Sequence, residues 1–292
     1  MAAQERKLLE ARDIYLTKII KALCYCRTLP HLEYLAWEEY DGLSPSFFRA
    51  INMSSIRHFK IDRPADTCIS DLAMKLSDTI LYGWPLRTLY MKWDHEDIED
   101  DIAEDEPSPR LPASLLRKSA ATIETLTWSN YRRSAEPTFA ADSIPKFPSL
   151  RRLRLGRFTP LADVPILKTF LDSKLTSLLI LVGECVVVDI LKHHGDIPSL
   201  QTLSMNNPPI EFLQANTQLS RIQLLYSTGD FTVDFLESEF LPLFSVHFPN
   251  LTSLHITWPD ECASVPQKSL QIVGQLRNLN QLCMACGEVT GV

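Results

Sequence analysis

Ten short segments of this 292-residue chain share one apolar spacing, and that repetition constrains the fold more than any other feature. In each segment, apolar residues occupy the first, fourth and sixth positions, as in Leu150, Leu153 and Leu155. First positions follow one another at intervals of 19 to 37 residues and fall at residues 32, 56, 86, 123, 150, 175, 200, 219, 251 and 279. Because alternate side chains of a strand point to opposite faces, the fourth and sixth positions share a face. Each segment is therefore predicted to be a strand with one buried face.

Repeats of this length and pattern are typical of leucine-rich repeat solenoids, in which each unit supplies one strand and a returning helix or loop. We predict an α/β leucine-rich repeat solenoid of about ten parallel strands over residues 29–292. Apolar stripes at helical spacing predict convex-side helices between the strands. The expected helices cover residues 66–82, 162–174, 186–194, 209–215, 233–244 and 266–276.

The two ends of the repeat array need separate treatment, since terminal repeats expose the core unless something covers it. Residues 5–27 show an amphipathic helical pattern, so residues 1–28 are predicted to form an N-terminal capping helix. The last predicted strand lies close to residue 292. Three alternatives stay open there: the final residues fold back, a partner covers the last strand, or the chain is a fragment of a longer protein.

One segment carries most of the negative charge. Residues 94–106 hold nine carboxylates and no Lys or Arg, so the rest of the chain, whose total formal charge is −7, is close to neutral. Prolines follow, and residues 94–112 are predicted to be a disordered loop, with an acidic arm that docks on a basic partner as the alternative. No broad basic face is available to neutralise phosphates, so we do not expect a nucleic acid partner.

The compartment follows from three features. The first thirteen residues, MAAQERKLLEARD, carry charges where a signal peptide needs an apolar core. No apolar run approaches the ~20 residues that span a bilayer, so no membrane association is expected. Seven cysteines without framework spacing agree with a reducing environment. We expect an intracellular protein, cytoplasmic or nuclear.

The clearest repeat lines are FPSLRRLRLG, IPSLQTLSM and FPNLTSLHITW. They resemble the leucine-rich repeat regions of fungal F-box-like proteins, and the resemblance covers residues 29–292. It implies that the repeats recruit a substrate while an F-box binds the adaptor of a cullin-type ubiquitin ligase. The chain contains no F-box-like LPxEL…I segment before its first repeat, so no F-box residue is carried over. The ninth repeat position also lacks the Asn or Cys of regular repeats, which predicts an irregular solenoid.

Catalytic and metal-binding patterns are absent from the sequence. There is no GxxxxGK[ST], GxGxxG, GxSxG or HExxH pattern. In a solenoid, Cys24-x-Cys26 and Cys283-x-x-Cys286 lie at opposite ends and cannot share one zinc tetrahedron. The adjacent His193 and His194 are expected to end a helix rather than bind a metal. We therefore expect a non-enzymatic protein with no cofactor and no catalytic or metal site.

What remains is the strand face opposite the core, formed by the third, fifth and seventh repeat positions. We expect this concave face to bind a protein of unknown identity, because Tyr and Arg are frequent anchors of protein interfaces. The candidate partner-binding residues are Tyr34, His58, Lys60, Tyr90, Lys92, Arg152, Arg154, Arg221 and His255. The expected function is a protein-interaction scaffold, either a substrate-recognition part of a cullin-type ubiquitin ligase or a stand-alone interaction or regulatory protein.

Overall fold

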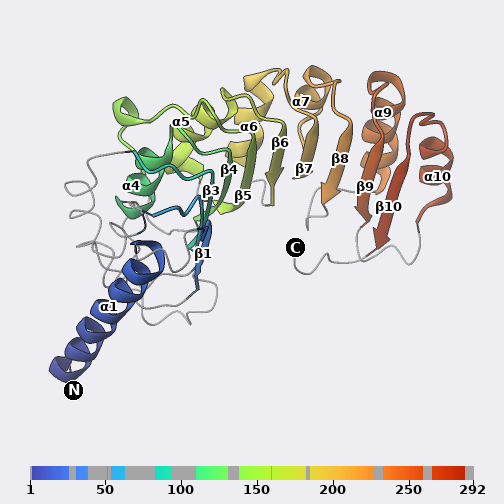
Figure 1. The fold of residues 1–292 in the computed structure, drawn as a ribbon. Coiled ribbons are helices and arrows are strands. Elements are labelled where there is room, and N and C mark those ends of the chain that lie inside the picture. Colours follow the sequence, from blue (N-terminus) through green and yellow to red (C-terminus); the bar gives the residue numbers. More distant parts are fainter. Residues whose placement is uncertain are drawn as a thin grey trace. The chain divides into compact units, whose positions relative to one another are not determined.

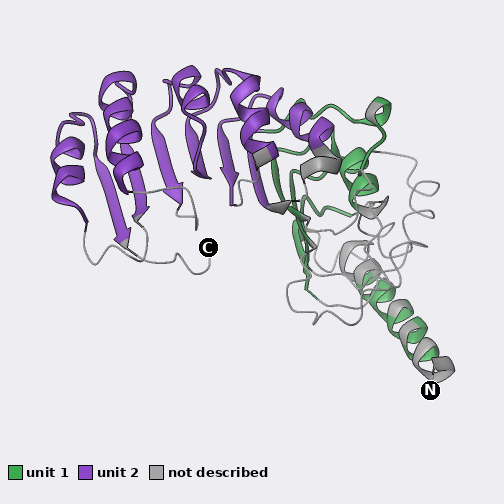
Figure 2. Cartoon of the chain, turned by 180° about the vertical axis from the view of Figure 1, so that it is seen from behind, with its two compact units in different colours: residues 1–150 green, residues 151–292 purple. Residues whose placement is uncertain are grey.

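The computed structural model describes most of the repeats. The described residues are 2–25, 31–38, 51, 54–62, 83–93, 110–130, 138–158, 160–181, 185–225, 233–258 and 265–286. The chain divides into two compact units, residues 1–150 and residues 151–292 (Figure 2). Each unit is described separately below.

Within the described part of unit 1, four parallel strands follow one another in chain order (Figure 1). The elements are α1 (Ala2–Tyr25), β1 (Tyr34–Trp37), β2 (His58–Asp62), β3 (Thr88–Trp93), α4 (Arg110–Ser119), β4 (Thr125–Asn130) and the short 3-10 helix η2 (Ala141–Ser143).

The described part of unit 2 alternates strands and helices more regularly. Its strands are also parallel and pair in chain order. They are β5 (Arg152–Phe158), β6 (Ser177–Ile180), β7 (Thr202–Asn206), β8 (Arg221–Leu225), β9 (Ser253–Trp258) and β10 (Gln281–Cys286). The helices are α5 (Pro160–Leu171), α6 (Cys185–His194), α7 (Ile210–Ala215), α8 (Val233–Phe235), the π-helical η3 (Leu236–Phe240), α9 (Leu241–His247) and α10 (Gln267–Val273).

These elements confirm the predicted α/β leucine-rich repeat fold with its ten parallel strands. The five helical regions expected between residues 162 and 276 are present, with ends shifted by a few residues. Helix α4 was not predicted. It begins at Arg110, so residues 110–112 are helical and not part of the expected loop over 94–112. Leu115 and Leu116 bury its apolar side, while Pro112 sits in the first turn, where a missing N–H costs little. The remainder of that loop, 94–109, and the helix expected at 66–82 lie outside the described residues.

The core follows the predicted alternation along the inner strands. Leu153 and Leu155 of β5 are at most 2% exposed, and Leu203 and Met205 of β7 are fully buried. The helical side of unit 2 adds an aromatic layer. The rings of Phe235, Phe240, Phe244 and Phe248 contact one another in sequence, with centroids 5.3 to 6.3 Å apart. Burial of such apolar side chains is the main stabilising contribution to a repeat array.

A backbone ladder joins successive repeats at the point where their strands begin. The carbonyl of Arg57 accepts bonds from the N–H groups of Arg87 and Thr88 at 2.7 and 3.1 Å. The carbonyl of Thr252 does the same for Asn280 and Gln281 at 2.8 and 3.0 Å. One carbonyl thus holds two consecutive amides of the next repeat and sets the register of the strand that follows.

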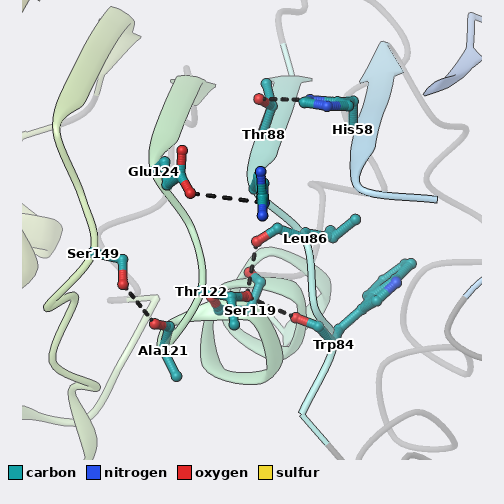
Figure 3. A network of polar contacts seen from close by, with 10 residues as sticks. His58, Trp84, Leu86, Thr88, Ser119, Ala121, Thr122, Glu124 and Ser149 are labelled. Atoms are coloured by element: carbon teal, nitrogen blue, oxygen red, sulfur yellow. Dashed lines mark hydrogen bonds and ion pairs between the residues drawn. The ribbon is translucent and has the colours of Figure 1, made fainter. Parts of the chain in front are cut away.

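Side-chain hydroxyls reinforce this ladder from the residue just before the first apolar position. Ser199 Oγ donates to the carbonyl of Leu175 at 2.7 Å, and Ser55 Oγ donates to that of Leu32 at 2.9 Å. Thr122 Oγ1 donates to the carbonyl of Leu86 at 2.8 Å, as Figure 3 shows. At the second repeat position, Thr176, Ser220 and Thr252 make equivalent bonds to Arg151, Gln201 and Ser220 at 3.2, 3.3 and 3.1 Å. Hydroxyls at the start of the strand therefore join repeats that have no asparagine ladder at the ninth position.

The loop after α6 shows how one buried amide organises a repeat. Helix α6 ends at His194, as predicted, and Gly195 follows with a φ of 86°, a left-handed conformation that favours glycine. The fully buried Asn216 accepts the N–H of Ile197 at 2.8 Å and donates to the carbonyls of Gly195 and Phe212 at 3.3 and 2.8 Å. This side chain satisfies three backbone groups that would otherwise be buried without partners.

Helix α1 forms where the amphipathic pattern predicts a helix. Three members of its apolar stripe are exposed, namely Leu8 at 67%, Ile14 at 57% and Tyr15 at 65%. Thr17 is buried, and the Arg12 guanidinium lies 5.8 Å from the centre of the Trp37 ring. The capping role predicted for residues 1–28 stays a prediction.

Candidate functional site

The strands present one buried face and one face that we call the open face, formed by the third, fifth and seventh repeat positions. The burial pattern of β6 alternates residue by residue, with Leu178 and Ile180 buried and Ser177 and Leu179 half-buried. The described helices of unit 2 bury their own apolar side chains, such as Phe212 and Leu213 of α7. They therefore pack on the buried face, and Figure 1 shows α6, α7, α9 and α10 following one another beside the strands. The described helices of unit 2 therefore leave the open face uncovered.

In unit 1, the open face carries a polar and aromatic cluster. The register pairs Tyr34 with His58 and His58 with Thr88. His58 Nδ1 lies 2.9 Å from Thr88 Oγ1, a hydrogen bond visible in Figure 3. In the next row the register pairs Lys60 with Tyr90, and the Lys60 ammonium lies 5.1 Å from the centre of the Tyr90 ring, a cation–π distance. Tyr34 is 56% exposed at the edge of this cluster.

The Lys60 charge is neutralised inside the cluster. Its Nζ donates to Glu38 Oε1 at 2.6 Å and lies 3.9 Å from Asp62 Oδ2. The hydrogen bond to Glu38 raises the pKa of Lys60, which stays protonated at neutral pH. Two carboxylates facing one ammonium give these three side chains a net formal charge of −1, so this cluster is not a cationic surface and its aromatic side chains are the stronger feature.

In unit 2, the open face carries the predicted arginines and a hollow. Arg152 and Arg154 lie on β5, with Arg152 exposed. The register places Arg152, Ser177, Thr202 and Arg221 in one row across β5 to β8. Arg152 and Arg221 are thus three strands apart, about 14 Å at ordinary strand spacing. They can contact one extended partner but not one functional group.

The hollow lies over β7 to β10 and has a volume of about 520 Å³. Residues of the third, fourth and fifth repeat positions line it, together with Asn280 of the second position. The fourth-position residues are Leu203, Ile222, Leu254 and Leu282. The residues of the third and fifth positions are Thr202, Arg221, Gln223, Ser253, His255, Gln281 and Cys283. Burial lowers the pKa of His255 below the ordinary value of 6.5, so its imidazole is neutral at pH 7. Cys283 is an exposed free thiol.

The nine predicted site residues thus fall into two groups. Unit 1 holds Tyr34, His58, Lys60, Tyr90 and Lys92, and unit 2 holds Arg152, Arg154, Arg221 and His255. The structure brings Lys60 into contact with Tyr90, and it places Arg221 and His255 at one hollow. Lys92 stands opposite Asp62 in the register.

Several residues of these sites were not among the predicted ones. Glu38 and Asp62 neutralise Lys60, and Gln223, Ser253 and Cys283 line the hollow. Their positions in the repeat could have identified these residues from the sequence. All five occupy the third, fifth or seventh repeat position, but selection for aromatic and basic side chains passed over acids, amides, hydroxyls and thiols.

Within the described residues, no group of three or more His, Cys, Asp or Glu side chains could hold a metal ion. None of the described helices is long and apolar enough to cross a membrane.

Comparison with known proteins supports the fold. No family model matches the chain, and no curated protein sequence matches it either. Among solved structures, the chain is similar to the leucine-rich repeat-containing protein LegL7 from Legionella pneumophila, with a TM-score of 0.52 and 15% sequence identity. The match covers 89% of this chain and 85% of LegL7. At this identity the similarity supports a leucine-rich repeat fold and carries no information on function.

Proposed function

We propose that this protein is a non-enzymatic interaction scaffold that binds a protein partner on its open face. The observation that carries the proposal is the cluster of unit 1, in which exposed Tyr34 lies in the row beside the contacting pair Lys60 and Tyr90. Tyr side chains supply large contact areas and a polar end at low conformational cost, which is why they anchor protein interfaces.

The arrangement of the strands supports a protein rather than a small molecule. Parallel strands place equivalent side chains in rows at intervals of about 4.8 Å. Rows of this kind form an extended surface in each unit. An extended surface with aromatic anchors matches a polypeptide segment better than a compact metabolite.

The test uses a partner captured by affinity purification and then purified. Tyr34→Ala should weaken binding of that partner by about tenfold, equivalent to ~1.4 kcal/mol, with an unchanged melting temperature. Tyr15→Ala is the matched control, because Tyr15 of α1 is 65% exposed and Tyr34 is 56% exposed, so both variants remove an exposed tyrosine. Equal affinities of the two variants and the wild type would move the interface away from this cluster.

Substrate recognition for a cullin-type ubiquitin ligase is the more specific form of this proposal, and it rests on the type of repeat. A stand-alone interaction or regulatory protein is the alternative. The same affinity purification, carried out with proteolysis blocked, distinguishes the two hypotheses. A ligase component should co-purify with a cullin and its adaptor, and a stand-alone protein should not. An intracellular location is part of both forms, in keeping with seven cysteines that lack framework spacing.

A further inference from the structure

The hollow over β7 to β10 differs from the cluster of unit 1 in the state of its cation. Lys60 already faces two carboxylates. Arg221 is exposed, and no described side chain forms an ion pair or hydrogen bond with its guanidinium. A guanidinium is always charged and presents donors in a planar fork that matches a carboxylate. Arg221 therefore carries an unused binding capacity for an anion.

The neighbouring side chains add donors and no competing acid. None of the described side chains that line the hollow is acidic. The Ser204 hydroxyl donates to Gln223 Oε1 at 3.0 Å, which fixes that amide and leaves its nitrogen as a donor. The register places Ser253 directly beside Arg221 and His255 directly beside Gln223. One cation and several neutral donors thus converge within four adjacent strands.

We propose that this hollow binds the carboxylate of an aspartate or glutamate side chain of the protein partner, with Arg221 as the charged donor and Ser253 and Gln223 as neutral donors. The inference rests on the proposed function and names the chemistry of one part of the partner. A carboxylate fits better than a phosphoryl group, since a phosphate carries ~1.5 to 2 negative charges and is usually met by a cluster of arginines. The hollow supplies a single arginine, and its histidine is neutral at pH 7.

The direct test uses a defined probe and the full chain. The probe is a capped hexapeptide with one glutamate, compared with the same peptide carrying glutamine or phosphoserine at that position. Binding is followed by amide and arginine side-chain NMR shifts. A second readout is the alkylation rate of Cys283, measured by mass spectrometry of its peptide, because this exposed thiol lies in the hollow. The glutamate peptide should shift the Arg221 signals and slow alkylation of Cys283, and the glutamine peptide should do neither.

Two variants locate the effect. Arg221→Gln should weaken glutamate-peptide binding by at least tenfold. Arg277→Gln removes the same charge from an exposed arginine outside the hollow and should leave binding unchanged. Equal loss in the two variants, or equal binding of the glutamate and glutamine peptides, would overturn the proposal. Tighter binding of the phosphoserine peptide by more than tenfold would overturn the choice of a carboxylate.

The captured partner separates this inference from the proposed function. If Tyr34→Ala weakens binding of the partner and Arg221→Gln does not, the scaffold function stands and the proposed carboxylate site is wrong. If neither variant changes the affinity for the partner, the open face is not the interface, and both the proposed function and the carboxylate site are wrong. Loss in both variants, together with the peptide result, supports both proposals.

Discussion

At the scale of single residues, consecutive positions on β6 have opposite surroundings. Leu178 and Leu179 are identical side chains on β6, yet Leu178 is fully buried and Leu179 is half-buried on the open face. On β7, Leu203 is buried and Thr202 beside it is half-buried, whereas Ser204 on the open face is also buried at 3% exposure. Residue type alone therefore does not determine how much a substitution costs, and position in the repeat does.

Leu178→Asp should destabilise the protein by at least ~3 kcal/mol, since it places an unpaired charge in the core. Leu179→Asp makes the same chemical change one residue later and should cost ~1 kcal/mol or less. Urea denaturation followed by circular dichroism measures both. A similar loss in the two variants would contradict the assignment of faces on β6.

The pKa of His255 gives a second prediction at this scale. Burial lowers that pKa in the folded state below 6.5, while the unfolded chain keeps the ordinary value. The unfolded state then binds more protons in acid, so stability is complete above pH ~6.5 and falls as the pH drops toward the folded-state pKa. An NMR titration of the His255 ring should show a midpoint below 6.5, and His255→Gln should reduce the loss of stability in this range. A midpoint at or above 6.5 would contradict the burial of the ring.

At the scale of elements, each strand is held in register by bonds made before it begins. The carbonyls that accept two N–H groups of the next repeat, and the hydroxyls just before the first apolar position, lie at the same edge of the sheet. Figure 3 shows Ser149 and Thr122 both reaching the carbonyls of the preceding repeat. One Ser or Thr at this position is enough to make the hydrogen bond to the preceding repeat, so repeats of unequal length can be joined in the same way.

Ser199→Ala should cost ~1 kcal/mol, because Ser199 is half-buried and its bond to the Leu175 carbonyl is 2.7 Å long. Ser220→Ala removes a weaker, exposed bond of 3.3 Å from the same edge and should cost about 0.5 kcal/mol or less. Thermal and urea denaturation of the two variants gives the comparison. An equal effect, or a larger one for Ser220→Ala, would mean that the hydroxyls do not contribute through these bonds.

At the scale of the whole molecule, burial differs between the first and last described strands and the inner ones. Leu35 and Trp37 of β1 are half-buried, and Leu282 of β10 is 47% exposed. The corresponding residues of β2, Phe59 and Ile61, are at most 1% exposed. In a repeat array each unit contacts only its neighbours, so a strand with one neighbour has fewer buried contacts.

Hydrogen exchange measured by mass spectrometry should therefore be faster in β1 than in β3, and faster in β10 than in β7. Local opening costs less free energy where fewer apolar contacts are buried. Each comparison lies within one unit, and the inner strand is its internal control. Equal protection across the strands of a unit would contradict this gradient. A bound partner that covers β10 would appear as slower exchange in β10 alone.

The sequence by itself determined the ten strands, their parallel repeat architecture and the face that the inner strands bury. These properties follow from local apolar spacing, because strand alternation depends only on residues within one segment. Helix α4 was not predicted from the sequence, since the strongly acidic and proline-rich residues before it indicated a loop.

Only the tertiary structure decided which side chains of the open face are free to bind. Lys60 and Arg221 have equivalent signals in the sequence, but Glu38 from a neighbouring segment neutralises Lys60, while Arg221 borders a hollow without acids. Asn216 and Ser199 likewise each donate to a carbonyl about twenty residues away or more, in Gly195 and Leu175. The physical reason is that charge pairing, burial and hydrogen bonding depend on neighbours in adjacent repeats, and repeats of unequal length bring those neighbours together only once the chain has folded.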